Sequence, residues 1–299
     1  MAVMRSARPI LVAIFSAFVF TLSVPAPAQE APTSATHETS ARPDIEKLIH
    51  DSGADVSIAF RSLDGGQELL IHADLPFRDS VAMKLPVMIE LFAQAQAQEL
   101  RLTDSIRVRN LFRSLADGSA YAVDPASGDT LTHDAGQWMT LRDLCEAMIT
   151  RDSDIAANLL IEKLGLQSIQ NRIHSLGADG MVLASGFGDS AAIAKGVRNA
   201  TTPRALMTIL LALAHNQVVD ADASREMIRI LSRSRLPGSI AYSPASAARV
   251  LTPTGDVHDA DIVFGARSFV LVVDVRGLTD PQATAALVGQ IAHLLAAAI

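Results

Sequence analysis

Sequence with the alternating pattern of β-strands occurs only near the two ends of this 299-residue chain. Residues 56–60 alternate between apolar and small side chains, and a turn with two glycines at 64–66 leads into another apolar run at 68–71. Near the other end, two β-branched runs at 260–264 and 268–275 are separated by a short turn that contains glycine. Each pair of runs is typical of a β-hairpin.

The stretches between these hairpins repeat apolar residues at the spacing of one helix face. They cover residues 85–92, 141–148, 155–160 and 206–213, and a further one runs from about Asp280 to the end of the chain. Strands from both ends of a chain, with helices between them, favour one antiparallel sheet built by the two termini. The sequence therefore predicts an α+β fold in which an all-helical lobe is inserted into a sheet lobe.

We expect this fold to occupy residues 44–299 as a single domain. The sheet lobe is predicted at 44–79 and 245–299, and the helical lobe at about 80–236. The preceding residues 29–43 are rich in Pro, Ser, Thr, Ala and Glu and lack apolar periodicity. That composition is typical of a flexible spacer.

The first 28 residues have the pattern of a signal peptide. Arg5 and Arg8 precede an apolar run at 10–24, and Ala26 and Ala28 stand at the small-residue positions of an Ala-x-Ala cleavage site. The run is shorter than the roughly 20 residues that a membrane-spanning helix needs. We expect cleavage near Ala28 and a secreted protein in the periplasm or outside the cell. An uncleaved anchor is the alternative.

Charge and cysteine content restrict the partners. Loss of the two N-terminal arginines would change the formal net charge from −7 to about −9, and the chain has no basic block. Nucleic acid is therefore not an expected partner, nor is a stable membrane span after cleavage. The single cysteine, Cys145, lies in an apolar helical pattern, which predicts a buried and unreactive thiol.

Three short stretches carry a resemblance to a known family. They are Val81-Ala82-Met83-Lys84-Leu85-Pro86, the segment 148–160 around Asp152-Ser153-Asp154, and the segment 249–255 that ends in Pro253-Thr254-Gly255. Their order and separation resemble the Ser-x-x-Lys, Ser-Asp-Asn and Lys-Thr-Gly motifs of class A β-lactamases and related penicillin-recognising serine hydrolases. The resemblance implies a β-lactamase/transpeptidase-like fold, in which the sheet lobe is a three-layer α/β/α sandwich.

The resemblance also implies a serine mechanism without a cofactor or a metal. In that family the first serine attacks a carbonyl carbon, and the lysine one turn later takes or relays its proton. The second serine passes the proton to the leaving nitrogen, and the last lysine binds the substrate carboxylate. A glutamate on a separate loop activates the water that releases the acyl group. The implied ligands are β-lactams or small molecules resembling cell-wall peptides.

Most of these positions are substituted in this chain. Val81 stands at the nucleophile position, and Asp152 stands where the second serine belongs. Pro253 replaces the last lysine, although Thr254 and Gly255 are kept. The position of the glutamate is expected to fall on Ala194, and that of its asparagine partner on Arg198. Lys84 is therefore the expected survivor of the catalytic set.

Ser80 offers an alternative nucleophile, because it lies four residues before Lys84 and would share its helix face. The competing interpretation is that Asp79 or Ser80 caps the helix. Two functions therefore remain open: an active serine hydrolase that uses Ser80 and Lys84, or a catalytically silent relative that binds a ligand or partner. We favour the second. In either case we expect Lys84 and Asp152 to form an ion pair at the base of the cleft.

Two further patterns are set aside. Gly186-Phe187-Gly188 weakly resembles a dinucleotide-binding turn, but the acidic residue that should end a following strand is missing, and this segment is expected beside the lost glutamate position. His258, Asp259 and Asp261 could suggest metal ligands. Successive residues of a strand point to opposite faces, however, so a turn with one solvated face is expected there.

Overall fold

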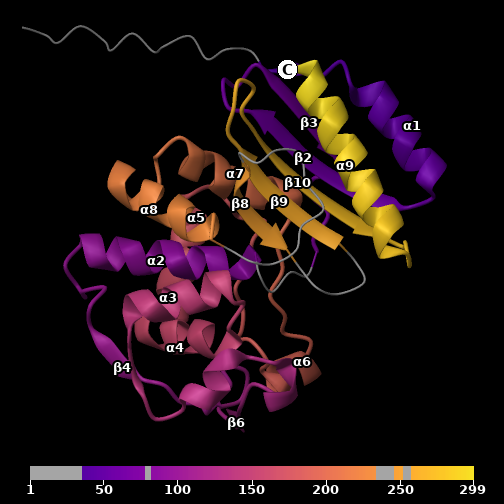
Figure 1. Cartoon of the computed structure of the whole chain (residues 1–299). Coiled ribbons are helices and arrows are strands. Elements are labelled where there is room, and N and C mark those ends of the chain that lie inside the picture. The colour runs from indigo at the N-terminus through magenta and orange to yellow at the C-terminus, as the bar shows by residue number, and fades with distance from the viewer. Residues whose placement is uncertain (1–35, 78–81, 234–245, 252–256) are drawn as a thin grey trace, which may run out of the picture. The chain divides into compact units, whose positions relative to one another are not determined.

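A computed structural model describes residues 36–77, 82–233, 246–251 and 257–299 (Figure 1). The predicted signal peptide, residues 29–35 of the predicted spacer and several candidate site residues lie outside the described residues. These site residues are Asp79, Ser80, Val81, Pro253, Thr254 and Gly255. Among the described residues, no helix is both long and apolar enough to cross a membrane.

A six-stranded sheet joins the two ends of the chain, as predicted. Its strand order is β1-β3-β2-β10-β9-β8. The central pair, β2 and β10, runs antiparallel over the whole length of both strands, with Ser57 opposite Asp274. The strands are β1 (His37–Glu38), β2 (Asp55–Ser62), β3 (Gln67–Ile71), β8 (Ser246–Leu251), β9 (Val257–Val263) and β10 (Phe269–Arg276).

The fold begins before the predicted boundary at residue 44. His37 and Glu38 pair in parallel with Gln67 and Glu68 of β3, and a helix starts at Arg42. The predicted spacer at 29–43 is therefore wrong for residues 37–43. A strand of two residues is too short to give an alternating pattern, so the sequence contains no signal for it.

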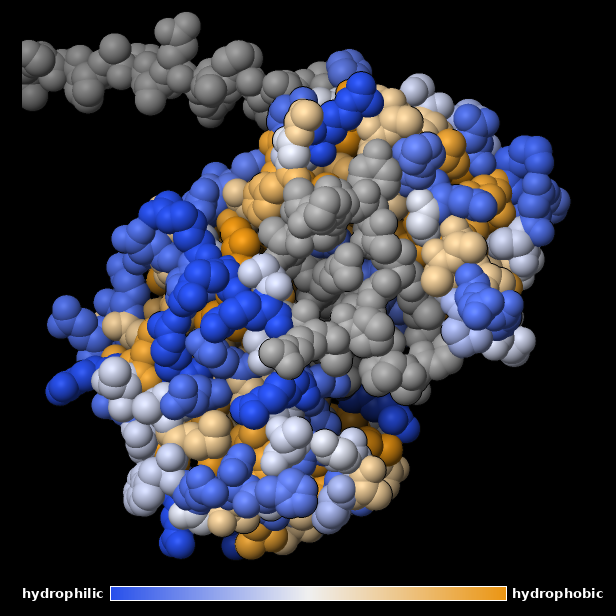
Figure 2. Space-filling model, viewed as in Figure 1, coloured by the Kyte–Doolittle hydropathy of each residue, from blue (hydrophilic) through white to orange (hydrophobic). Residues whose placement is uncertain are grey.

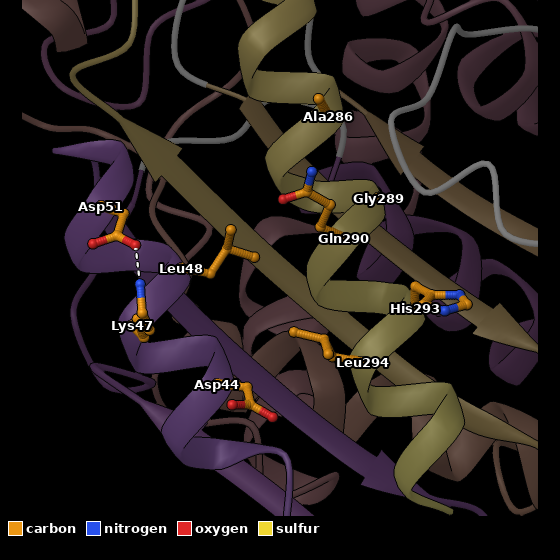
Figure 3. A pocket seen from close by; sticks show the side chains of 9 residues that line it. All are labelled: Asp44, Lys47, Leu48, Asp51, Ala286, Gly289, Gln290, His293 and Leu294. Atoms are coloured by element: carbon orange, nitrogen blue, oxygen red, sulfur yellow. Dashed lines mark hydrogen bonds and ion pairs between the residues drawn. The ribbon is translucent and has the colours of Figure 1, made fainter.

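Helices cover both faces of the sheet. On one face, α1 (Arg42–Ser52) and α9 (Pro281–Ala298) lie side by side and bury Ile45 and Ile291 against Phe60 and Leu271 (Figure 1). A groove of about 640 Å³ runs between the two helices, with Leu48 and Leu294 pointing into it (Figure 3). Full burial of an aliphatic side chain such as Ile45 or Ile291 contributes roughly 1.5–3 kcal/mol.

The other face is covered by α7 (Pro203–Ala214), which contacts β2, β9 and β10. The predicted helical lobe at about 80–236 includes this helix, whereas in the structure it forms the third layer of the sandwich. Its apolar residues Ile209, Leu210 and Leu213 are fully buried. The predicted three-layer arrangement is thus present.

The remaining helices form the inserted lobe. The helix α3 carries Cys145, whose side chain is fully buried, as predicted. Burial raises the pKa of this thiol to about 12, so the thiolate is disfavoured. The lobe contains α2 (Leu85–Gln96), α3 (Leu141–Thr150), α4 (Asp154–Leu164), α5 (Leu166–Ser175), α6 (Ser190–Ala194) and α8 (Ala221–Leu231), together with the two-stranded pairs β4 (Ser105–Arg107) with β7 (Trp138–Thr140) and β5 (Phe112–Arg113) with β6 (Ala120–Tyr121).

The solvated turn predicted around His258 is wrong. His258, Asp259 and Asp261 lie within β9 and are buried. The ring of His258 stacks on Phe77 at 4.7 Å, and its Nδ1 lies 2.6 Å from a carboxylate oxygen of the fully buried Asp274. A polar or charged side chain can be buried at lower cost when it has a partner. The polar residues at 258–261 are therefore not sufficient evidence for an exposed turn.

Candidate active site

The candidate site is built around Lys84, at the end of a short 3₁₀ turn (Ala82–Lys84) that leads into α2. Pro86 occupies one of the first positions of α2, where its missing N–H leaves no helical hydrogen bond unmade. Every residue from Leu85 to Ala93 is buried, so this helix runs through the core of the helical lobe. It thereby fixes Lys84 in the interior, with its side chain fully buried.

Three oxygen atoms surround the ammonium group of Lys84. Its Nζ donates a hydrogen bond to the backbone carbonyl of Asp152 at 2.8 Å and another to the Asp152 carboxylate. A carboxylate oxygen of Asp154 lies 2.7 Å away. The ring of Phe187 lies 5.1 Å from Nζ, within the range of a cation–π contact. The predicted ion pair between Lys84 and Asp152 is therefore confirmed, and Asp154 completes it.

The Asp152 backbone has a left-handed conformation, with φ at 57°. This conformation costs an L-residue roughly 1–2 kcal/mol, although aspartate tolerates it better than most. It ends the turn after α3 and allows Ser153 to cap α4, where the Ser153 hydroxyl accepts from the Ala156 N–H at 3.1 Å. The two hydrogen bonds from Lys84 to Asp152 hold this strained residue in place.

A carboxylate from a distant segment supports the same turn. Asp129 accepts hydrogen bonds from the Ser153 hydroxyl at 2.8 Å and from the backbone N–H groups of Ile155 at 2.9 Å and Leu131 at 3.0 Å. It therefore places negative charge at the N-terminus of α4, where the helix dipole favours it. Asp129 has no signal in the sequence, because it belongs to no motif and its role depends on a contact with Ser153, 24 residues away.

The loop before α6 covers the other side of Lys84. Asn158 of α4 accepts from the Phe187 N–H at 2.7 Å and donates to the Phe187 carbonyl at 2.8 Å. Gly186 is required beside it, because a Cβ there would lie 2.0 Å from the Tyr121 hydroxyl. These contacts place Phe187 over Lys84. Gly188, which is expected in the loop near the lost glutamate position, follows Phe187 directly.

The structure does not bring Ala194 and Arg198 to this cluster. Ala194 ends α6 and is exposed, and Arg198 is exposed four residues later. The residue of this loop that contacts Lys84 is Phe187, so the assignment of the glutamate position to Ala194 is not supported. The loop has no periodicity from which the correct alignment could have been found.

Electrostatics at the site are dominated by burial. Burial raises the pKa of the Asp152 carboxyl above its usual value; Lys84 opposes this effect, and the nearby carboxylate of Asp154 adds to it. Burial also raises the pKa of the Tyr121 hydroxyl, with further contributions from Asp189, Glu162 and Asp154. The region around the lysine is therefore rich in carboxylates. Among the described residues, no group of three side chains could hold a metal ion.

The three-layer sheet lobe, the inserted helical lobe and the buried Lys84 at the start of α2 are the features of a penicillin-recognising serine hydrolase fold. A family model described as "Beta-lactamase enzyme family" matches residues 40–299, so the chain belongs to the β-lactamase enzyme family. The predicted resemblance is thereby confirmed. A β-lactamase from Rhodobacter capsulatus is 29% identical over 221 residues, which cover 73% of this chain and 70% of that protein.

Solved structures with lower identity share the fold. A β-lactamase from Sphaerobacter thermophilus has a TM-score of 0.70 and 22% identity, covering 85% of this chain and 95% of that one. PBP-A has a TM-score of 0.72 and 19% identity, with coverage of 88% and 97%. A mutant of PBP-A, with a TM-score of 0.72, 20% identity and coverage of 90% and 98%, is an acyl-enzyme complex with penicillin G.

We predict that the Lys84 cluster is a strong structural interaction. Lys84→Met should cost about 3–5 kcal/mol of unfolding free energy, because it leaves Asp152 and Asp154 without their buried cation. Asp152→Asn should cost less, because Asp154 still pairs with the lysine. Denaturant unfolding of both single variants and the double variant measures the coupling.

The exposed pair Lys47–Asp51, at 2.5 Å on α1, is a matched control for this cycle (Figure 3). Its coupling should be about 0–1 kcal/mol. A coupling for Lys84 and Asp152 as small as that of the control would show that the cluster does not stabilise the fold.

We also predict an inverted pH dependence for Asp152. An unfolded aspartate has a pKa of about 3.9. The pKa of Asp152 in the folded protein is higher, so between these two pKa values the folded protein binds the proton more tightly than the unfolded chain does. The stability that Asp152 contributes, relative to Asp152→Asn, should therefore fall as the pH rises through that window. Urea unfolding from about pH 3 to 7 measures this difference.

Asp117 provides the opposite case. A hydrogen bond from the Ser119 hydroxyl is the largest cause that lowers its pKa, to about 2. Its contribution should be present above about pH 3.9 and should be lost as the pH falls towards 2. If Asp152→Asn and Asp117→Asn change with pH in the same direction, the account of the Asp152 environment is wrong.

Proposed function

We propose that this protein is a catalytically silent member of its family, which uses the remnant cleft or its outer surface for binding in the cell envelope. The observation that carries the proposal is the pair of carboxylates, from Asp152 and Asp154, that lie against the Lys84 nitrogen. An ammonium group within reach of two carboxylates has no lone pair with which to take a proton from a nucleophile. A lysine held in this way stabilises structure and is a poor general base.

The charge of the cleft supports the same proposal. Asp152 and Asp154 add two carboxylates beside a single lysine, and their side chains are 24% and 29% exposed. The motif that should provide a second lysine has Pro253 instead. A ligand carboxylate would therefore meet net negative charge, which disfavours the binding mode that the family uses for β-lactams.

We predict no β-lactam turnover above a protein-free control, and no stable acyl adduct. The reason is that members of a catalytic unit act together, so a remaining hydroxyl such as Ser80 lacks the base and the carboxylate-binding lysine. Hydrolysis of a chromogenic cephalosporin and intact mass after incubation with penicillin G measure the two outcomes. Val81→Ser should not restore turnover.

The control for this experiment is Ser80→Ala. Turnover or an adduct that is present in the natural protein and disappears in Ser80→Ala would establish the alternative, an active hydrolase with a shifted Ser80/Lys84 pair. Such a result would overturn the proposal. An adduct that survives the substitution would point to another nucleophile and would equally contradict a silent cleft.

We further predict that the mature chain begins at or near Gln29. The two N-terminal arginines, the short apolar run and the Ala-x-Ala sequence support export and cleavage. N-terminal sequencing of protein exported from expressing cells identifies the first residue. Retention of Met1 in the exported or membrane fraction would contradict the prediction, and Ala28→Arg should block cleavage as a control.

A further inference from the structure

A β-hairpin of the helical lobe presents large apolar side chains to solvent. Along β5 and its flanks, Phe112 and Ser114 point inwards and are buried, whereas Leu111, Arg113 and Leu115 point outwards. The two leucines are 60% and 61% exposed. We call Leu111, Arg113 and Leu115 the outer row. Burial alternates from residue to residue between Leu111 and Leu115, around the two-residue strand β5, so these three side chains lie on the outer side of the hairpin.

The hairpin is held rigid at its base. The Asn110 amide donates to the Val123 carbonyl and accepts from the Val123 N–H, both at 2.8 Å. Between these residues and the tip, the rings of Phe112 and Tyr121 pack with their centroids 5.6 Å apart. The exposed leucines therefore flank the short strand β5 in a hairpin whose base is fixed by hydrogen bonds and ring packing.

The tip of the hairpin is tied to the segment that follows α6. Lys195 donates to the Ala116 carbonyl at 3.1 Å and lies 3.3 Å from the Asp117 carboxylate. Ile193 of α6, two residues before Lys195, is also an exposed apolar residue. Apolar side chains show among polar ones at the end of the helical lobe where β6 and α6 lie (Figures 1 and 2). Apolar groups gathered on a rigid surface are typical of interaction sites.

Two hollows lie along the outer row. One, of about 350 Å³, is lined in part by Leu111 and Phe112, and the other, of about 270 Å³, by Leu115 and other apolar residues of the lobe. Arg113 and Glu162 line both. Arg109 also lines the hollow beside Leu111, so apolar and charged groups share that hollow, whereas the hollow beside Leu115 is the more apolar of the two.

The charged residues beside the outer row differ in whether they have an ion-pair partner. Glu162 forms an ion pair with the neighbouring Arg109. Arg113 donates to the Gly118 carbonyl at 3.1 Å, and no ion pair joins it to any residue that the structure describes. Its guanidinium is exposed and is the positive group between the two hollows. The charge complementary to this position is a carboxylate, which guanidinium groups bind well.

We propose that the outer row docks an extended peptide segment of a partner protein, with an acidic residue flanked by apolar residues two positions before and after it. The acidic side chain pairs with Arg113, and the apolar side chains enter the hollows beside Leu111 and Leu115. This spacing matches the repeat of a β-strand, because every second side chain of an extended peptide faces the same surface. The three side chains of the outer row are not part of the Lys84 cluster, although the hollow beside Leu115 is also lined by Asn158 and Gly186, which position Phe187. Substitutions in the outer row therefore test peptide binding separately from the chemistry of Lys84.

Binding of a designed peptide tests this proposal on the full mature chain. The probe is a fluorescein-labelled peptide, Ser-Thr-Leu-Thr-Glu-Thr-Leu-Thr-Ser, followed by fluorescence anisotropy. Saturable binding is expected, and replacement of the glutamate by lysine should weaken it about tenfold or more, because like charges then meet. Arg113→Glu and the double variant Leu111→Ser/Leu115→Ser should each weaken binding of the original peptide by about tenfold or more.

Matched controls separate this site from a general apolar or basic surface. Leu75→Ser and Arg101→Glu change an exposed leucine and an exposed arginine elsewhere on the chain, and they should leave binding unchanged. All these side chains are exposed, so thermal unfolding should show that the variants remain folded. Equal binding by the outer-row and control variants, equal affinity for the lysine peptide, or binding to phosphatidylglycerol vesicles in place of the peptide would overturn the proposal.

Discussion

The helical lobe is organised around a buried cation that must be compensated. Lys84 is fully buried at the start of α2, and removing such a charge from water without partners costs several kcal/mol. Its partners, Asp152 and Asp154, come from the turn that joins α3 to α4. One electrostatic requirement therefore fixes the left-handed Asp152 and the start of α4, and through Asn158 of that helix it is linked to the loop that carries Phe187.

This network explains how the family fold persists although the residues of the second motif differ. The carboxylate that accepts hydrogen bonds at the N-terminus of α4 comes from Asp129, and Ser153 supplies the cap. Each of these buried polar groups has a partner, so the turn keeps its geometry although the residues of the second motif have changed. The substitution of Asp152 is thus part of a satisfied network rather than an isolated loss.

Much of the architecture could be predicted from the sequence, because it depends on strong periodic patterns. The hairpins at both ends and the helices around Leu85 and Leu206 rest on such patterns, and the ion pair of Lys84 with Asp152 followed from aligned motifs. Asp129 could not be predicted, because it belongs to no motif and its partners at the start of α4, Ser153 and Ile155, are 24 and 26 residues away in the sequence. His258 was placed in a solvated turn because polar residues usually face water, and its burial depends on the carboxylate of Asp274 on the next strand.

The two carboxylates beside Lys84 also give a physical reason for the presence of this lysine. If the lysine of this motif served only as a proton acceptor, a chain without the catalytic serines of the motifs would gain nothing from burying it. In this structure, however, replacing it by an apolar residue would leave two neighbouring carboxylates to repel each other at reduced solvent exposure. Substitution of Lys84 alone is therefore unfavourable as long as both Asp152 and Asp154 are present. A lysine kept at a family's catalytic position can thus be retained by its electrostatic partners, and its presence alone is not evidence of catalysis.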